Sequence, residues 1–82
     1  MFSQGNVVIL NDRGKLHHDK KYYKKRIHKD RMMIVISSFM YKNKVRYLLR
    51  DSFSDFTDKY FEFHLEFKYK NMREARFELL GY

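Results

Sequence analysis

The sequence predicts a mainly β protein: a small, strongly bent antiparallel sheet or an SH3-like barrel, with a long basic loop and a short C-terminal helix. Three observations predict this class. Residues 60–69 alternate between apolar and polar side chains, which is the two-residue period of a β-strand. Two other strand-like runs are joined by the polar residues 42–44, which is the pattern of a hairpin. Strands and helices do not alternate along the chain, so a parallel sheet is not expected.

Composition limits the classes of protein that the chain can form. The 82 residues predict a single domain, residues 1–82, whose small core depends on eight Phe and seven Tyr. There is no cysteine, so disulfides are not expected and a reducing cytoplasm is the expected location. No apolar run approaches the roughly 18 residues of a membrane span, and we expect no membrane partner. The net charge of +8 favours an anionic partner, with nucleic acid first and an acidic protein next.

The N-terminal part of the chain is expected to contain one strand and one long loop. Residues 6–10 form an apolar run, which predicts the first strand. Residues 11–14, Asn-Asp-Arg-Gly, predict a turn that could lead into a hairpin through Lys15 and Leu16. Residues 17–30 are expected to form a mobile loop, because like charges at helical spacings repel one another. A short helix is the alternative for this segment.

The middle of the chain predicts the centre of the sheet. Residues 32–36 are apolar on both faces, which is typical of a central strand. The return strand, residues 45–50, alternates between apolar and polar side chains, with Leu48 as an apolar residue on the outer face. The side chains expected to face inward are Val45, Tyr47 and Leu49.

Residues 60–69 are expected to form one long strand with a single apolar face. His64 would then lie on the wet face between Glu62 and Glu66, in a structural cross-strand ion pair. The side chains expected to face inward are Phe61, Phe63, Leu65, Phe67 and Tyr69.

The last segment predicts a helix. Residues 71–74, Asn-Met-Arg-Glu, have the spacing of a helix N-cap box, and Gly81 stands where a C-terminal cap would be. We therefore expect a short helix at about residues 72–80. A last strand at residues 76–80 is the alternative.

The strongest functional signal is the basic segment 13–31, which contains nine of the eighteen Lys and Arg residues. Cations neutralise phosphates, and the interleaved tyrosines offer rings on which unpaired bases can stack. This pattern predicts a nucleic-acid-binding segment. A solvated charge run that keeps the protein soluble is the alternative. The predicted binding residues are Arg13, Lys20, Lys21, Tyr22, Tyr23, Lys24, Lys25, Arg26 and Lys29.

The histidines of the basic segment are candidates for acid–base chemistry. Neighbouring cations lower the proton affinity of an imidazole, which would keep His17, His18 and His28 neutral at pH 7. A loop position without a chemical task is the alternative reading for each of them. No cysteine accompanies them and the nearby acids do not repeat at ligand spacing, so we expect neither a metal nor another cofactor.

Two stretches resemble a known family. They are Gln4-Gly5-Asn6-Val7-Val8, and residues 29–38, in which a loop ends at Arg31 before an apolar strand that closes in Ile-Ser. Both resemble the PemK/MazF-type toxins, which are small SH3-like barrels that cleave RNA without a metal. The resemblance implies that Arg31 holds the scissile phosphate and takes part in proton transfer, with Ser52 as its assistant. We add His28 as a candidate acid–base aid.

Three hypotheses of function follow from these patterns. The first is a protein of the toxin–antitoxin type that binds RNA, with single-stranded RNA favoured, and acts as a metal-independent endoribonuclease. The second is a phage- or plasmid-encoded inhibitor that binds and blocks a host protein or complex. The third is a non-catalytic module that binds RNA or DNA. A homodimer is expected under any of them from exposed apolar residues such as Leu48.

Overall fold

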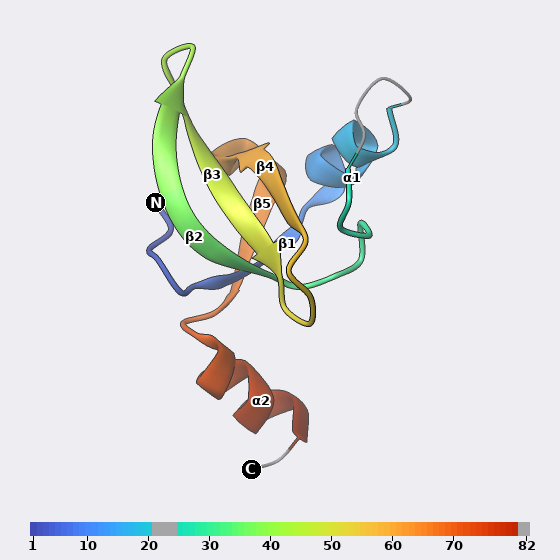
Figure 1. Ribbon diagram of the computed structural model, residues 1–82, viewed down its shortest axis with the longest axis vertical. Coiled ribbons are helices and arrows are strands. Elements are labelled where there is room, and N and C mark those ends of the chain that lie inside the picture. Colours follow the sequence, from blue (N-terminus) through green and yellow to red (C-terminus); the bar gives the residue numbers. More distant parts are fainter. Residues whose placement is uncertain (21–24, 81–82) are drawn as a thin grey trace.

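A computed structural model describes residues 1–20 and 25–80 of the chain. It contains five strands in one antiparallel sheet with the order β4-β3-β2-β1-β5 (Figure 1). The strands are β1 (Val7–Leu10), β2 (Met33–Tyr41), β3 (Lys44–Asp51), β4 (Thr57–Phe61) and β5 (Leu65–Tyr69). The predicted mainly β fold, with an antiparallel sheet and a C-terminal helix, is therefore confirmed.

The hairpin of β2 and β3 forms the long, curved part of the sheet (Figure 1). Lys42 and Asn43 have φ values of 49° and 64°, and positive φ at both central residues is the geometry of a type I′ turn. The pairing register shifts between Val35 and Ser37, and such an irregularity bends a strand. The predicted hairpin and the predicted central position of residues 32–36 are both confirmed.

The core lies between the inward faces of all five strands. Tyr47 and Leu49 of β3 are fully buried in it, and Val45 packs against its edge, as the alternation predicts. Each fully buried side chain of this size contributes about 1.5–3 kcal/mol through the area it removes from water. The buried cluster consists of Val8, Leu10, Ile27, Met33, Val35, Tyr47, Leu49, Tyr60 and Leu65.

The prediction of a single long strand at residues 60–69 is wrong. β4 ends at Phe61, the 3-10 helix η1 (Glu62–His64) follows, and β5 begins at Leu65. β4 pairs with β3 while β5 pairs with β1, so the chain must cross from one edge of the sheet to the other between them. The turn resets the alternation: Leu65 is buried, whereas Phe63 and Phe67 are 36% and 50% exposed.

The turn and hairpin expected after the first strand are also wrong. Residues Asp12–His18 form the helix α1, which includes Lys15 and Leu16. Asn11 caps it, because its side-chain Oδ1 accepts a hydrogen bond from the backbone N–H of Gly14 at 2.9 Å. The same residue type that favours a turn therefore begins a helix here.

The loop expected at residues 17–30 is confirmed for the described residues 19, 20 and 25–30, which lie outside any helix or strand, but it begins two residues later than predicted. Residues 17 and 18 belong to α1, and Ile27 is only 3% exposed and belongs to the core cluster. The carboxylate of Asp58 accepts hydrogen bonds from the backbone N–H groups of Arg26 and Ile27, at 2.8–3.1 Å. The remaining predicted binding residues, Lys21, Tyr22, Tyr23 and Lys24, lie outside the described residues.

The C-terminal helix α2 spans Met72–Leu80 and lies beyond the end of the sheet (Figure 1). The Oδ1 of Asn71 accepts a hydrogen bond from the backbone N–H of Glu74 at 2.8 Å, so the predicted N-cap is confirmed and the alternative strand is excluded. The predicted cap at Gly81 lies outside the described residues. Within the described chain, neither helix combines the length and apolar character needed to cross a bilayer.

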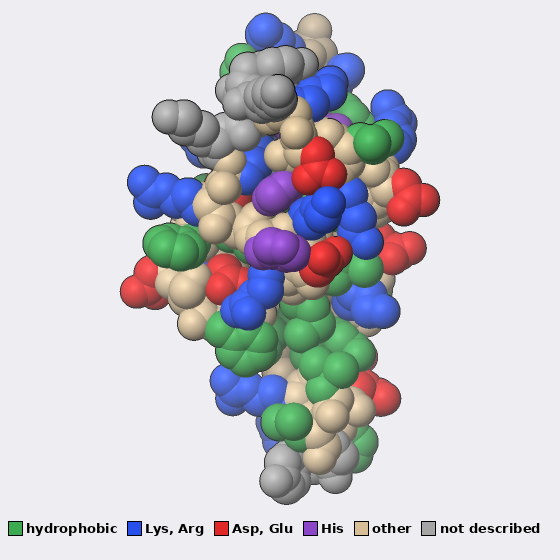
Figure 2. Space-filling model, turned by 90° about the vertical axis from the view of Figure 1, so that its right-hand side faces the viewer, with side chains coloured by type: hydrophobic (Ala, Val, Ile, Leu, Met, Phe, Trp, Pro, Cys, Tyr) green, Lys and Arg blue, Asp and Glu red, His purple; other side chains and the backbone are tan. Residues whose placement is uncertain are grey.

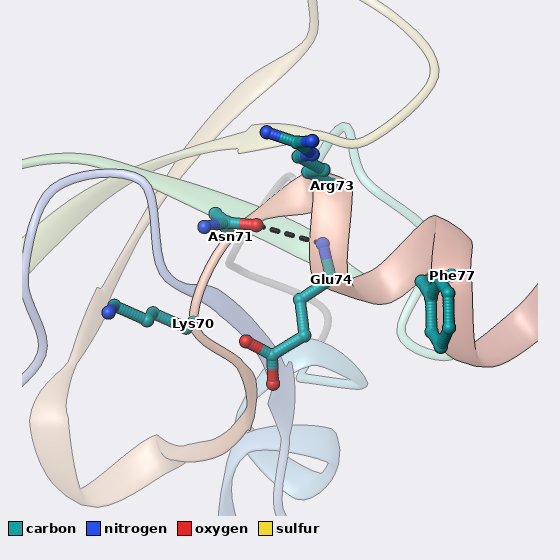
Figure 3. Close-up of a pocket in the computed structure, with 5 residues that line it drawn as sticks. All are labelled: Lys70, Asn71, Arg73, Glu74 and Phe77. Atoms are coloured by element: carbon teal, nitrogen blue, oxygen red, sulfur yellow. Dashed lines mark hydrogen bonds between the residues drawn. The ribbon is translucent and has the colours of Figure 1, made fainter. Parts of the chain in front are cut away.

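A hollow of about 620 Å³ opens beside the start of α2 (Figure 3). In Figure 3 the side chains of Lys70 and Arg73 extend on different sides of Asn71, and the ring of Phe77 lies one turn further along the helix. The polar groups therefore do not converge on one point, and we assign no chemistry to this hollow. Its lining residues are Lys70, Asn71, Arg73, Glu74 and Phe77.

Candidate nucleic-acid interface

Three aromatic rings, at the last residues of β2 and β4 and in η1, lie in a row. The rings of Phe61 and Phe63 are stacked, with centroids 5.4 Å apart and planes only 5° from parallel. The ring of Tyr41 follows, with its centroid 6.1 Å from that of Phe61. Phe63 reaches this position because η1 turns it outward at the end of β4. The row is therefore a consequence of the turn that the alternating pattern did not predict.

Four cations of the described chain lie over these rings, and one of them is Lys42, whose Nζ is 5.4 Å from the ring centroid of Tyr41. The guanidinium carbon of Arg13 is 4.8 Å from the centroid of Phe63. The Nζ of Lys44 lies over the same ring at 5.4 Å. The guanidinium carbon of Arg46 lies 5.2 Å from Phe61 and 5.0 Å from Tyr41. We call this surface the cation–aromatic strip, and it consists of Arg13, Tyr41, Lys44, Arg46, Phe61 and Phe63.

In the predicted basic segment, several cations are paired with acidic side chains. Lys29 forms an ion pair with Asp19 at 3.0 Å, and Lys15 forms one with Asp30 at 3.7 Å. On the face of the molecule in Figure 2, acidic side chains accordingly lie among the Lys and Arg side chains and the histidines. Asp19 and Asp30 therefore offset part of the positive charge from which this segment was predicted to bind phosphates.

Lys25 and Arg26, which were also predicted to bind nucleic acid, are held by the sheet. The Nζ of Lys25 donates to the backbone oxygen of Lys59 at 2.9 Å and lies 4.5 Å from the ring centroid of Tyr60. Burial lowers the pKa of Lys25 from its ordinary value, and the charge of Asp58 opposes this. Of the predicted binding residues, Arg13 lies over the ring of Phe63, and Lys20 lines the pocket described below.

The residues implied in catalysis lie near one end of β2 and β3, but Arg31 already has a partner. Its Nε and Nη2 donate to the two carboxylate oxygens of Asp51, both at 3.0 Å, although the side chain is 40% exposed. The Oγ of Ser52 is buried without a hydrogen-bond partner in the described chain. His28 is exposed, and its Nδ1 is 3.8 Å from Asp30. The structure thus shows no convergence of Arg31, Ser52 and His28 on one pocket.

Acid is expected to remove the stabilisation that the Arg31–Asp51 pair provides. Burial would raise the pKa of Asp51, but hydrogen bonds from Arg31 and Ser54 outweigh it and hold the pKa below its ordinary value. Such a carboxyl stabilises the fold fully above the unfolded-state pKa of about 3.9, and this stabilisation is lost as the pH falls through the folded-state pKa. The difference in free energy of unfolding between wild type and Asp51→Asn should therefore be largest above about pH 5.

Urea denaturation at a series of pH values measures this difference. It should shrink steadily below about pH 4, as Asp51 becomes protonated in the wild type. Asp55→Asn is the matched control, because Asp55 is an exposed residue of the adjacent loop and should show a small difference at every pH. A difference between wild type and Asp51→Asn that does not change with pH would contradict the pairing.

His64 is the functional candidate that sequence reasoning missed. It was expected on the wet face of a strand in an ion pair, and this is wrong: its side chain is 93% buried, with 7% exposed. Its ring stacks on that of His17 with centroids 4.5 Å apart, and the ring of Phe63 lies edge-on at 4.4 Å. The Nδ1 of His64 is buried and has no hydrogen-bond partner among the described residues. No signal in the sequence relates His17 to His64, because the fold alone brings them together.

A pocket of about 260 Å³ lies beside this histidine pair. Burial, together with the charges of His17, Arg13, Lys25 and Lys20, lowers the pKa of His64 to about 4. Burial also lowers the pKa of His17, followed by the charges of Lys25 and Lys20. Both imidazoles are therefore neutral at pH 7. The pocket is lined by Arg13, Leu16, His17, Lys20 and His64, and we call it the histidine pocket.

In the part of the chain that the structure describes, no three or more His, Asp or Glu side chains are placed to hold a metal ion together. Comparison of the chain with protein-family models, with curated proteins and with solved structures finds no match. The resemblance to the PemK/MazF-type toxins thus rests on the quoted residues alone and stays a prediction.

Proposed function

We propose that this protein binds single-stranded nucleic acid, with RNA favoured, through the cation–aromatic strip. The observation that carries the proposal is the row of Tyr41, Phe61 and Phe63 with a cation over each ring. Aromatic rings stack unpaired bases, at about 1–3 kcal/mol per base, while neighbouring cations neutralise the phosphates of the same strand. Such a surface suits a single strand, whose bases are free to leave their own stack.

The charges of the strip are available to a ligand. In the part of the chain that the structure describes, Arg13, Lys44 and Arg46 form no ion pair with a carboxylate. Lys15 and Lys29, in contrast, are paired with acids. This difference favours the strip over the basic segment as the main contact surface.

Replacement of Phe63 tests the role of the rings. Phe63→Leu keeps an apolar side chain but removes the stacking face, so the affinity for a short oligouridylate should fall about tenfold, which is about 1.4 kcal/mol. Fluorescence anisotropy with a labelled 12-nucleotide strand measures it. Phe63→Tyr should retain the affinity of the wild type, because it retains the ring.

Phe67→Leu is the matched control for this test. Phe67 is an exposed phenylalanine on β5, outside the strip, and its replacement should leave the affinity unchanged. Lys44→Ala adds a second readout, because the loss of one phosphate contact should reduce the slope of log affinity against log salt by about 0.7. Equal affinities of Phe63→Leu and Phe67→Leu would contradict the proposal.

Cleavage of RNA through Arg31 is a separate question. Arg31 already donates to both oxygens of Asp51, so a phosphate would have to displace that carboxylate before the guanidinium could stabilise it. Our proposal is therefore limited to binding. Incubation of a mixed-sequence RNA in EDTA with wild type and Arg31→Ala tests the catalytic reading, and RNA that stays intact with both proteins would exclude it.

A protein partner is the second candidate, and the apolar side chains of α2 favour it. Phe77, Leu79 and Leu80 are all more than half exposed. Leu48, from which a homodimer was predicted, is half-buried, so α2 is the more exposed apolar surface. A pull-down from a host lysate after nuclease treatment tests this candidate. A stoichiometric protein that is lost with Leu79→Lys but kept with Phe63→Leu would support it.

A further inference from the structure

We propose that the histidine pocket holds one phosphate group of the bound strand, directly beside the base that stacks on Phe63. This inference rests on the proposed function and gives it a defined subsite. Arg13 connects the two places, because it lies over the ring of Phe63 and also lines the pocket. A nucleotide can thus stack its base on the strip and direct its phosphate into the pocket.

The size and the lining of the pocket suit a phosphate. Its volume of about 260 Å³ exceeds several times the roughly 30 Å³ that one water molecule occupies in the liquid. Arg13 and Lys20 contribute positive charge to the lining, and each imidazole has one N–H donor when neutral and two when protonated. These are the groups that proteins use to bind phosphate oxygens.

The pocket is held in a fixed shape by its own backbone. The N–H of Asn11 donates to the backbone oxygen of His64 at 3.0 Å. The side-chain Nδ2 of Asn11 donates to the backbone oxygen of Phe63 at 2.8 Å. Asn11 therefore joins α1, which carries Arg13 and His17, to η1, which carries His64. The subsite is pre-formed, so a ligand does not have to order it.

The buried Nδ1 of His64 is the strongest sign of a missing partner. A buried polar atom without a hydrogen bond costs about 1–3 kcal/mol, and each such atom in a folded protein calls for an explanation. A protein under selection for stability alone would place an apolar residue among these rings. A phosphate that shares a proton with the His17–His64 pair provides the reason for an imidazole here.

Binding of a phosphate should therefore be coupled to proton uptake. The cationic and titratable groups around the pair are Arg13, His18 and Lys20 from the α1 side, Lys25 from the segment before Ile27, and Arg46 from β3. Together with burial they keep both imidazoles neutral. A bound anion opposes their charge and favours the protonated imidazole. Its affinity should then rise as the pH falls from about 7.5 to 5.5.

The other titratable groups near the pair do not change the direction of this pH dependence. The phenol of Tyr60 faces both imidazoles edge-on. Burial and the charges of Asp58 and Asp19 raise the pKa of Tyr60, so it stays neutral throughout this range. A strand with a 5′-hydroxyl end carries only phosphodiesters, whose charge does not change between pH 5 and 8. The histidines are thus the groups whose titration the experiment reports.

The test is a titration of the full chain, with the imidazole resonances followed by NMR, using a 5′-hydroxyl oligouridylate at pH 5.5, 6.5 and 7.5. We expect the resonances of His17 and His64 to shift and the affinity to rise about fivefold across this range. Lys20→Ala should weaken binding about three- to tenfold, whereas Lys68→Ala, at an exposed position on β5, should not. His64→Phe, which keeps an aromatic ring among its neighbours but leaves His17 as the only imidazole of the pair, should reduce the pH dependence.

Two further arms identify the ligand and separate the two proposals. A 5′-phosphorylated strand that alone shifts His64 would assign the pocket to a terminal monoester, and equal shifts with both strands would assign it to an internal diester. If the strand binds and Phe63→Leu weakens it while His17 and His64 stay unmoved, the pocket proposal is overturned and the strip stands. If inorganic phosphate shifts His64 but no strand binds, the pocket stands as a phosphate site and the proposed function fails.

Discussion

Asp58→Ala is expected to lower the free energy of unfolding by about 3 kcal/mol, because it leaves buried amides without an acceptor. The carboxylate is 8% exposed and accepts from the backbone N–H groups of Arg26 and Ile27. Ile27 is part of the core cluster, so the loss also loosens its packing. Urea denaturation followed by circular dichroism measures the change.

Asp58→Asn and Asp55→Ala make this prediction specific. The asparagine retains one oxygen, which can still accept a hydrogen bond from Ile27. The free energy of unfolding of Asp58→Asn should therefore lie between those of the wild type and of Asp58→Ala. Asp55 carries the same charge at an exposed position of the preceding loop, and Asp55→Ala should change the stability by less than about 0.5 kcal/mol. If Asp58→Ala and Asp55→Ala had equal effects, residues 25–27 would not be anchored to β4 as described.

The Asp58 contacts anchor a part of the basic loop for which the sequence gives no signal. Seen from the sequence, residues 17–30 carry repelling cations and one aliphatic residue, Ile27, which gives no periodic signal. In the fold, a single buried carboxylate from β4 accepts hydrogen bonds from the backbone N–H groups of Arg26 and Ile27, and this anchors these two residues. Asp58 lies far from Ile27 in the sequence, so no local pattern could predict the contact.

The elements that were predicted correctly depend on local signals. The turn at Lys42 and Asn43 separates two apolar runs, and Asn71 with Glu74 forms the cap of α2 through adjacent residues. Their physical causes lie within a few residues, so the sequence displays them directly. The same holds for the alternation of β3, in which Tyr47 faces the core.

The failures have non-local causes. The alternation of residues 60–69 is real, but β4 and β5 pair with strands at opposite edges of the sheet, and η1 must form where the chain crosses between them. The cation–aromatic strip and the histidine pocket both depend on this crossing, because it turns Phe63 outward and His64 inward. A pattern that treats these residues as one strand therefore cannot predict the candidate site.

Gly14→Ala is expected to destabilise the protein by about 2–3 kcal/mol, although alanine favours a helix over glycine by about 1 kcal/mol. A Cβ at this position would overlap the backbone oxygen of His64 and would press against the Cδ2 of Leu10 at 3.1 Å. The oxygen cannot move away without losing its hydrogen bond from Asn11. Thermal and urea denaturation measure the loss, with Leu16→Ala, at an exposed position of the same helix, as the control that should change little.

The same substitution connects the fold to the proposed site. The missing methyl group lets α1 lie directly on η1, and this contact sets the stacking of His17 on His64. Folded Gly14→Ala at low temperature should therefore show altered His17 and His64 resonances and a weaker response to inorganic phosphate, while Asp55→Ala, at an exposed position away from the pocket, retains both. A Gly14→Ala protein as stable as the wild type, with unchanged histidine resonances, would mean that α1 does not pack on η1 at this position. The pocket would then lose the contact on which its shape depends.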